Sequence, residues 1–201
     1  MVETSKCHFR RLRDGFFKYC AGVGLDVGCG FDPLNVAGLT TCDSHPDVKD
    51  LVGSTCSATY LSDFKDSQFD FVYSSHTLEH IINHQDALRE FWRVLKVGGY
   101  LIIYLPHRDL YERTRNLPPW NENHVSMWLP EIVPGVEPKG SYGLLNEMRD
   151  VFGPENFEVV RNIVCDYGYG IPTEGPDARF DNNKWVPRGE YSFEVVVKKL
   201  K

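Results

Sequence analysis

Short apolar runs alternate with helical or loop segments over residues 23–105, and this alternation constrains the fold more than any other feature of the chain. A helix is expected between Asn83 and Val97, because its apolar side chains recur at helical spacing and Gly98 and Gly99 can end it. Alternation of this kind is typical of βαβ units, which build a parallel sheet. The sequence therefore predicts the α/β fold class, with strands at 23–27, 39–43, 69–74 and 100–105.

The character of the sequence changes after about residue 105. Residues 107–140 contain five prolines and two tryptophans, which indicates a long irregular segment, and loops of that length are usually functional. Beyond it we expect a helix at 142–152 and strands at 157–165 and 191–199. At 201 residues the chain is predicted to be a single domain with loop insertions at about 106–140 and 166–188.

The charge balance disfavours a protein that binds nucleic acid mainly by neutralising phosphates, because 22 Lys and Arg face 28 Asp and Glu. A basic patch near the N-terminus is the exception. Its charges alternate at helical spacing with Phe9, Leu12, Phe16 and Phe17, so we interpret it as an amphipathic helix with these four side chains on its apolar face.

Targeting and cysteine patterns indicate a soluble cytoplasmic protein. The sequence has no apolar run long enough to span a membrane and no leader peptide pattern. Its six cysteines form no C-x-x-C pair, which argues against a zinc ribbon or a secreted disulfide framework.

The first predicted strand ends in Leu25-Asp-Val-Gly-Cys-Gly30, an acidic residue followed by a glycine turn. Gly28 and Gly30 let a ligand approach the backbone, and Asp26 favours a cationic group such as an ammonium. A nicotinamide-dependent oxidoreductase is disfavoured, because its fingerprint needs a small residue where Pro33 stands.

Asp43 ends the second predicted strand, seventeen residues after Asp26. A carboxylate at this edge of a sheet can accept hydrogen bonds from both hydroxyls of a ribose. Equally, Asp43 can simply start the turn before His45-Pro46.

Three stretches, LDVGCG at 25–30, FKDSQFDFVYSSHTLEHI at 64–81 and ALREFWRVLKVGGYLIIYLPH at 87–107, resemble the class I S-adenosylmethionine-dependent methyltransferases, in particular the type 11 group. This resemblance implies a Rossmann-like, mostly parallel seven-stranded sheet with flanking helices and an antiparallel last strand. It also implies S-adenosyl-L-methionine as cofactor. The binding residues that it implies are Asp26, Gly28, Cys29 and Gly30 for the methionine part, Asp43 for the ribose, Ser57 and Ala58 for the adenine, and Ser75 and His76 at the methyl-donor end.

Residues 106–124 are similar to a segment of methyltransferase-like proteins encoded among bacterial cell-surface polysaccharide genes. That similarity implies acceptor recognition by His107, Arg108, Asp109, Tyr111, Trp120, Asn121 and His124. The competing interpretation is a polar surface loop in which Trp120 is ordinary packing.

Methyl transfer to a hydroxyl needs alignment and removal of one proton, and histidine is the natural base at neutral pH. The candidates are His76, His107 and His124. The expected partner is a small-molecule or glycan acceptor methylated on oxygen, with no nucleic acid and no metal; an acceptor that is already a carboxylate would need no base.

Two other function classes stay open. His76-Thr-Leu-Glu79-His80 spells H-x-x-E-H, the inverted signature of zinc proteases, so a zinc-dependent hydrolase is one alternative. A non-catalytic protein that only binds S-adenosylmethionine is the other, because a fold alone does not establish activity.

Overall fold

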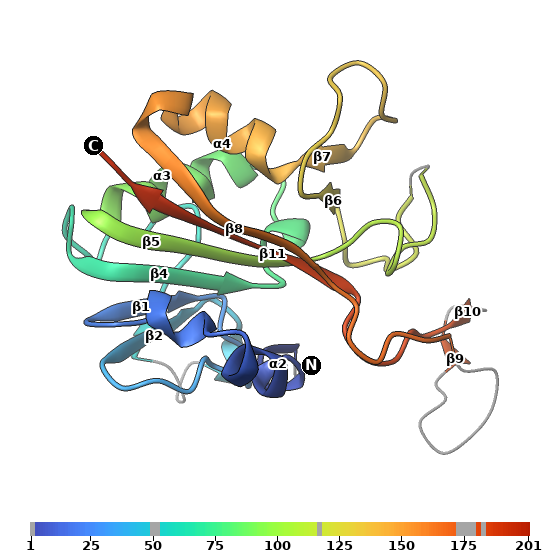
Figure 1. Ribbon diagram of the computed structural model, residues 1–201, viewed down its shortest axis with the longest axis horizontal. Helices are drawn as coiled ribbons and strands as arrows, with labels where there is room; N and C mark the ends of the chain where they lie inside the picture. The colour runs from blue at the N-terminus through green and yellow to red at the C-terminus, as the bar shows by residue number, and fades with distance from the viewer. Residues whose placement is uncertain (1–2, 49–52, 116–117, 172–179, 182–183) are drawn as a thin grey trace.

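The computed structural model describes residues 3–48, 53–115, 118–171, 180–181 and 184–201. Its centre is a seven-stranded sheet of order β3-β2-β1-β4-β5-β11-β8 (Figure 1). The strands are β1 (Gly24–Val27), β2 (Leu39–Asp43), β3 (Ser54–Thr55), β4 (Phe69–Ser75), β5 (Leu95–Pro106), β8 (Phe157–Cys165) and β11 (Ser192–Lys199).

Strand directions follow the predicted topology. The pairs β1 with β2, β1 with β4, β2 with β3 and β4 with β5 are parallel. β11 is antiparallel to both of its neighbours, β5 and β8. The prediction of a Rossmann-like, mostly parallel sheet whose last strand is antiparallel is confirmed.

Two longer helices, α3 (His84–Val94) and α4 (Leu144–Phe152), lie together on one side of the sheet (Figure 1). The chain enters on the other side through α1 (Glu3–Lys6), α2 (His8–Arg13) and the 3-10 helix η1 (Phe16–Tyr19). No helix follows the glycine turn: residues 28–38 run from β1 to β2 without one. The remaining short elements are η2 (Pro46–Val48), η3 (Leu78–His80), η4 (Pro154–Asn156), β6 (Met127–Leu129), β7 (Ser141–Gly143), β9 (Phe180–Asp181) and β10 (Lys184–Trp185).

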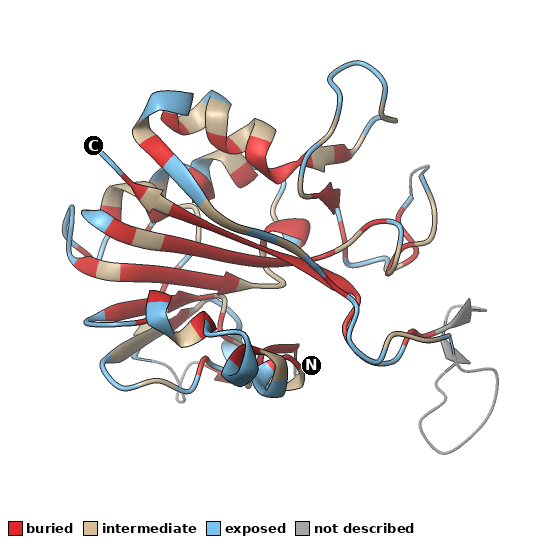
Figure 2. Ribbon diagram, viewed as in Figure 1, coloured by how far each residue is buried: buried red, intermediate tan, exposed pale blue. Residues whose placement is uncertain are grey.

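The core has one apolar layer on each side of the sheet. Residues of α3 and α4, such as Phe91 and Met148, pack with Val72 and Val195 on one side. Side chains of η1 pack against Tyr73 and others on the opposite side. The central strands are therefore buried along most of their length (Figure 2), and their carboxyl ends carry the polar residues discussed below.

The N-terminal helix buries a different face from the one predicted. Phe9 and Leu12 are 57% and 60% exposed, whereas Arg11 is 1% exposed. Arg11 reaches under the sheet, where Nε donates to Glu194 at 2.8 Å and Nη1 to the Tyr73 hydroxyl at 3.0 Å. The predicted apolar face is therefore wrong for Phe9 and Leu12. The helix turns Arg11 toward the sheet instead, because Glu194 and Tyr73 bind its guanidinium there.

The other predicted elements agree with the structure to within a few residues. The main difference is at Lys96–Gly99, which we expected to end the helix. These residues belong to the long strand β5, because the helix already ends at Val94.

Of the two predicted loop insertions, the described residues 107–115 and 118–140 of the first are irregular apart from the short strand β6. The second, 166–188, lies partly outside the described residues, at 172–179 and 182–183. Within the part of the chain that the structure describes, no helix is long and apolar enough to cross a membrane.

Candidate active site

A cavity of about 860 Å³ opens beyond the carboxyl ends of β1, β2 and β4, where ligands of open α/β sheets bind. Its walls come from the turns after these strands and from the segment that follows β3. The predicted residues Gly28, Gly30, Asp43, Ser57, Ala58 and His76 all line it. Polar turn residues thus surround a space of the size that small-molecule sites have.

The glycine turn requires glycine for two separate reasons. Gly28 has φ of +73°, and a Cβ there would lie 2.3 Å from the Thr77 hydroxyl oxygen. Gly30 has φ of +52° with open space around its Cα. Both residues therefore keep the backbone close to the cavity, in a conformation that larger side chains rarely adopt.

Asp26 is buried beneath this turn. One carboxylate oxygen accepts the Leu34 backbone N–H at 2.8 Å, while Oδ1 has no hydrogen-bond partner among the described residues. Burial raises the pKa of Asp26 to about 7, although the Leu34 hydrogen bond opposes the shift. Asp26 lines neither cavity, and its contact with the Leu34 N–H fixes the turn.

Asp43, at the end of β2, is hydrogen-bonded to the glycine turn that follows β1, and it lines the cavity. Its Oδ2 accepts the Gly30 backbone N–H at 2.8 Å, and Oδ1 accepts the His45 N–H at 2.7 Å. Each oxygen of a carboxylate can accept a further hydrogen bond. Asp43 therefore serves the turn before His45 and remains able to bind a diol.

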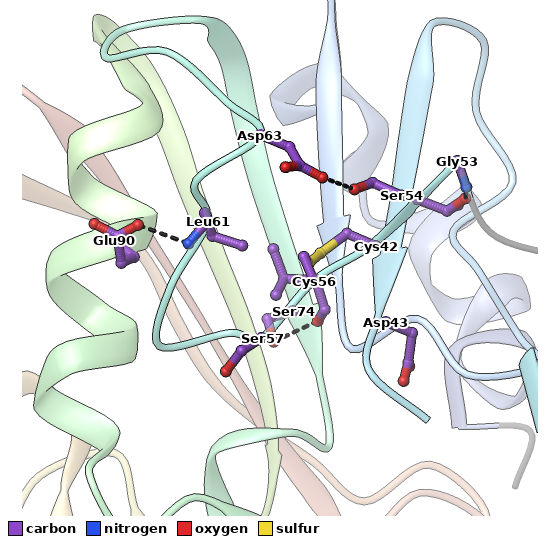
Figure 3. Close-up of a disulfide and its surroundings, with 12 residues drawn as sticks. Cys42, Asp43, Gly53, Ser54, Cys56, Ser57, Leu61, Asp63, Ser74 and Glu90 are labelled. Carbon is purple, nitrogen blue, oxygen red and sulfur yellow. Dashed lines mark hydrogen bonds between the residues drawn. A yellow bond between two sulfur atoms is a disulfide. The ribbon is translucent and has the colours of Figure 1, made fainter. Parts of the chain in front are cut away.

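A disulfide joins Cys42 to Cys56 beside the cavity (Figure 3). It links the residue before Asp43 on β2 to the residue before Ser57, and thus connects the predicted ribose and adenine residues covalently. The cysteine spacing did not predict this bond, because the two residues become neighbours only through the parallel pairing of β2 with β3.

A second, smaller cavity of about 170 Å³ shares Gly28, Gly30, Phe31, His76 and His80 with the first. The N-terminal helix α1 contributes part of its wall. The other lining residues are Glu3, Thr4, Cys29, Asp32, Ser75, Glu79 and His124. The predicted residues Cys29, Ser75 and His124 therefore lie here rather than in the larger cavity.

His76 lines both cavities. It follows β4 with φ of +50°, and its Nε2 shares a hydrogen bond with the Ser192 hydroxyl at 2.9 Å. Its Nδ1 lies 3.4 Å from Glu79 Oε1. Burial lowers the pKa of His76 to about 4, against the opposing effect of Glu3, so the imidazole is neutral at pH 7.

His124 is held by a buried carboxylate. Its Nδ1 is hydrogen-bonded to Glu112 Oε1, and Glu112 Oε2 accepts the Trp120 backbone N–H at 2.8 Å. On the other side of the ring, Asn121 Nδ2 lies 3.1 Å from Nε2. Glu112 therefore fixes both the tautomer and the orientation of His124.

The remaining predicted acceptor residues line neither cavity. Arg108 is 1% exposed and pairs with Asp109 and Glu137. Tyr111 and Trp120 belong to a small apolar cluster, and His107 packs on Phe193. Arg108 and Trp120 instead hold the loop together. Asn121 contacts His124, which lines the smaller cavity.

The H-x-x-E-H pentapeptide does not form the helix that a zinc protease needs. Only Leu78–His80 is helical, as a single 3-10 turn, and His76 precedes it with a positive φ. His76 and His80 therefore do not share a helical face, and this geometry counts against the hydrolase alternative.

Sequence reasoning missed two buried acids, Glu3 and Glu112, and considered Glu79 only within the H-x-x-E-H pattern. Glu79 is fully buried, and burial raises its pKa well above the ordinary value. Glu3 and Glu112 gave no usable signal, because their neighbours in space are distant in sequence.

Residues 25–103 match the family model described as a methyltransferase domain. A S-adenosylmethionine-dependent methyltransferase of Thermotoga maritima is 18% identical, with a TM-score of 0.52 and 100% of both chains covered. One of Methanosarcina mazei is 17% identical, with a TM-score of 0.55 and 93% of this chain and 97% of that chain covered. No curated protein sequence matches the chain.

The seven-stranded sheet and the match at residues 25–103 together support a class I S-adenosylmethionine-dependent methyltransferase. The site residues fit that cofactor. The buried Oδ1 of Asp26, which has no partner among the residues described, suits a nearby ammonium, and the free acceptor positions of Asp43 suit a ribose. The match at residues 25–103 thus supports a methyltransferase that uses S-adenosyl-L-methionine as its methyl donor.

Proposed function

We propose that this methyltransferase acts on a hydroxyl oxygen of a small-molecule or glycan acceptor, in polysaccharide or small-molecule modification. The observation that supports this most directly is the position of His76 in both cavities. The larger cavity has room for the cofactor, and the smaller one, walled by α1, has room for only a small reacting group.

S-adenosylmethionine supplies a methyl group already activated on a sulfonium, so the protein's tasks are alignment and proton removal. The glycine turn and Asp43 would hold the cofactor at the strand ends. His76, neutral at pH 7, can accept a hydrogen bond from an acceptor hydroxyl in the smaller cavity. His124, oriented by Glu112, is the second candidate base. His107 lines neither cavity, so it could act as the base only after the loop that carries it rearranges.

The acceptor's distal part would bind the loops at about 106–140 and 166–188. Buried aromatic rings such as Tyr111 and Trp120 stiffen the first of these loops. We propose Arg108, Tyr111, Trp120 and Asn121 as residues that shape this acceptor surface, in the case of Asn121 through its contact with His124.

Cytoplasmic localisation stays a prediction. The Cys42–Cys56 disulfide counts against it, because disulfides persist mainly in oxidising compartments and are rare in the cytosol.

The test is turnover. The enzyme is mixed with S-adenosylmethionine and a panel of free and nucleotide-linked sugars and small phenols, and S-adenosylhomocysteine release and methylated products are measured. With an accepted substrate, His76→Ala should lower turnover by about 10²-fold while cofactor binding stays nearly intact. His8→Ala, an exposed histidine outside both cavities, is the control.

Cofactor binding without turnover on any acceptor would instead support the non-catalytic alternative. Full turnover by both His76→Ala and His124→Ala would show that the acceptor needs no general base.

A further inference from the structure

Glu79, His80 and His124 place one carboxylate oxygen and two imidazole nitrogens within 4.8 Å of one another. Glu79 and His80 belong to η3, whereas His124 comes from the loop that follows β5. Two hydrogen bonds fasten this loop to η3: the Val125 N–H donates to the Glu79 carbonyl at 2.8 Å, and His80 Nδ1 lies 2.9 Å from the Asn123 carbonyl oxygen. The proximity of the three side chains is thus built into the backbone.

Both imidazoles are oriented as metal ligands usually are. His80 Nδ1 is hydrogen-bonded to a backbone carbonyl, and His124 Nδ1 to the Glu112 carboxylate. In metal sites such outer partners fix the tautomer and leave the other nitrogen free to coordinate. The two rings meet edge to face, with centroids 4.9 Å apart.

Glu79 gives an independent indication of a missing cation. Its side chain is fully buried, and neither carboxylate oxygen has a hydrogen-bond partner in the described parts of the chain. A buried carboxyl without partners costs free energy, and a bound cation removes that cost. His80 Nε2 is already 3.9 Å from Glu79 Oε1.

We propose that Glu79, His80 and His124 bind a divalent transition-metal ion of the zinc type. Two imidazoles and one carboxylate suit such ions, whereas magnesium prefers oxygen ligands. At zinc–ligand distances of about 2.1 Å, the ligand atoms of a tetrahedral site lie about 3.4 Å apart, so the cluster, now within 4.8 Å, must contract by up to about 1.4 Å on binding. The Asn121 contact with His124 Nε2 is given up on binding.

The ion would face the smaller cavity, which all three ligands line. The proposed metal site therefore adds to the proposed function and rests on it. There it can ligate the acceptor hydroxyl and lower its pKa. The hydroxyl proton passes to His76, because His124 is then a metal ligand and no longer a candidate base. The oxygen lone pair forms the new O–C bond, and the electrons of the broken C–S bond stay on sulfur, which becomes a neutral thioether.

The test is calorimetric titration of the full chain, stripped with a chelator and then dialysed, with Zn²⁺. Co²⁺ absorption in the visible range reports the coordination geometry. One ion per chain is expected. His80→Ala is the principal variant, because His80 is half-exposed and its loss should not impair folding. Glu79→Gln and His124→Ala follow, with His8→Ala as the matched control.

Each ligand variant should weaken Zn²⁺ binding by more than about 100-fold, and Glu112→Gln, which removes only an outer partner, by about 10- to 100-fold. His8→Ala should bind like the native chain. Absence of Zn²⁺ binding by the native chain, or equal affinity in His80→Ala, overturns the proposed site. S-adenosylhomocysteine binding with chelator present reports separately on the proposed cofactor site, because no metal ligand is among its proposed binding residues. Turnover is measured both with chelator and with Zn²⁺, and it should rise with Zn²⁺ in the native chain but not in His80→Ala.

Discussion

Replacing Asp43 with alanine tests the cofactor site most directly. The carboxylate lines the large cavity, and each oxygen already accepts one backbone N–H, from Gly30 at 2.8 Å or from His45 at 2.7 Å. The free acceptor position on each oxygen would take one ribose hydroxyl. Hydrogen bonds to a charged group contribute at least about 1.5 kcal/mol each, so two of them correspond to about 3 kcal/mol, or roughly 100-fold in affinity.

The assay is calorimetric titration with S-adenosylhomocysteine, accompanied by thermal unfolding of each variant. Asp43→Ala should weaken binding by more than about tenfold even if one ribose contact is replaced by water. Asp43→Asn, which keeps one acceptor oxygen, should lie between native and alanine. Asp47→Ala is the matched control, because its side chain is 74% exposed and not part of the cavity wall. Unchanged affinity in a well-folded Asp43→Ala would remove Asp43 from the ribose site.

Three further predictions concern the fold. In urea unfolding, Arg11→Met should lower the free energy of unfolding by about 3 kcal/mol or more, because the structure buries Arg11. Leu12→Ala should change it by no more than about 0.5 kcal/mol, because Leu12 is exposed. A larger loss for Leu12→Ala than for Arg11→Met would instead support the predicted apolar face. Burial raises the pKa of Asp26 from 3.8 to about 7, so between these values the folded apo-enzyme holds a proton that the unfolded chain has lost. The free energy of unfolding should therefore fall as the pH rises from 4 to 7. Asp26→Asn should lack this dependence on pH, and parallel profiles of the variant and the native chain would contradict the raised pKa. Thiol titration of the unfolded, unreduced chain should find four cysteines and, after reduction, six; six at the outset would exclude the Cys42–Cys56 bond.

The central strands β1, β4, β5 and β11 were predictable because they are mostly buried apolar runs, whereas β2 and β8 are largely half-buried or exposed. β2 and β8 agree with the expected bounds, and β4 and β11 differ by one residue. Burial on both faces makes such strands continuously apolar, and this signal is local in the sequence. The strands β3, β6 and β7 have two or three residues each and carry no such signal.

The cofactor side of the site was predictable for a related reason. In a parallel sheet the carboxyl ends of neighbouring strands share one edge, so polar residues after each strand converge whatever the loops do. Gly28, Asp43 and His76 all follow this rule and line one cavity. Arg11 shows where periodicity fails: a helix face is chosen by what the sheet offers, here a buried Glu194 and Tyr73, and these lie far away in the sequence.

The acceptor side could not be read from the sequence, because it depends on contacts between segments that do not follow from strand order. His124 lines the smaller cavity, where the Val125 N–H donates to the Glu79 carbonyl and the Glu112 carboxylate is hydrogen-bonded to the His124 ring. The H-x-x-E-H pattern contained two residues of the proposed metal cluster, but its helical interpretation paired them with His76. A 3-10 turn of three residues cannot present His76 and His80 on one face, so the third ligand has to come from another segment, and the loop supplies His124.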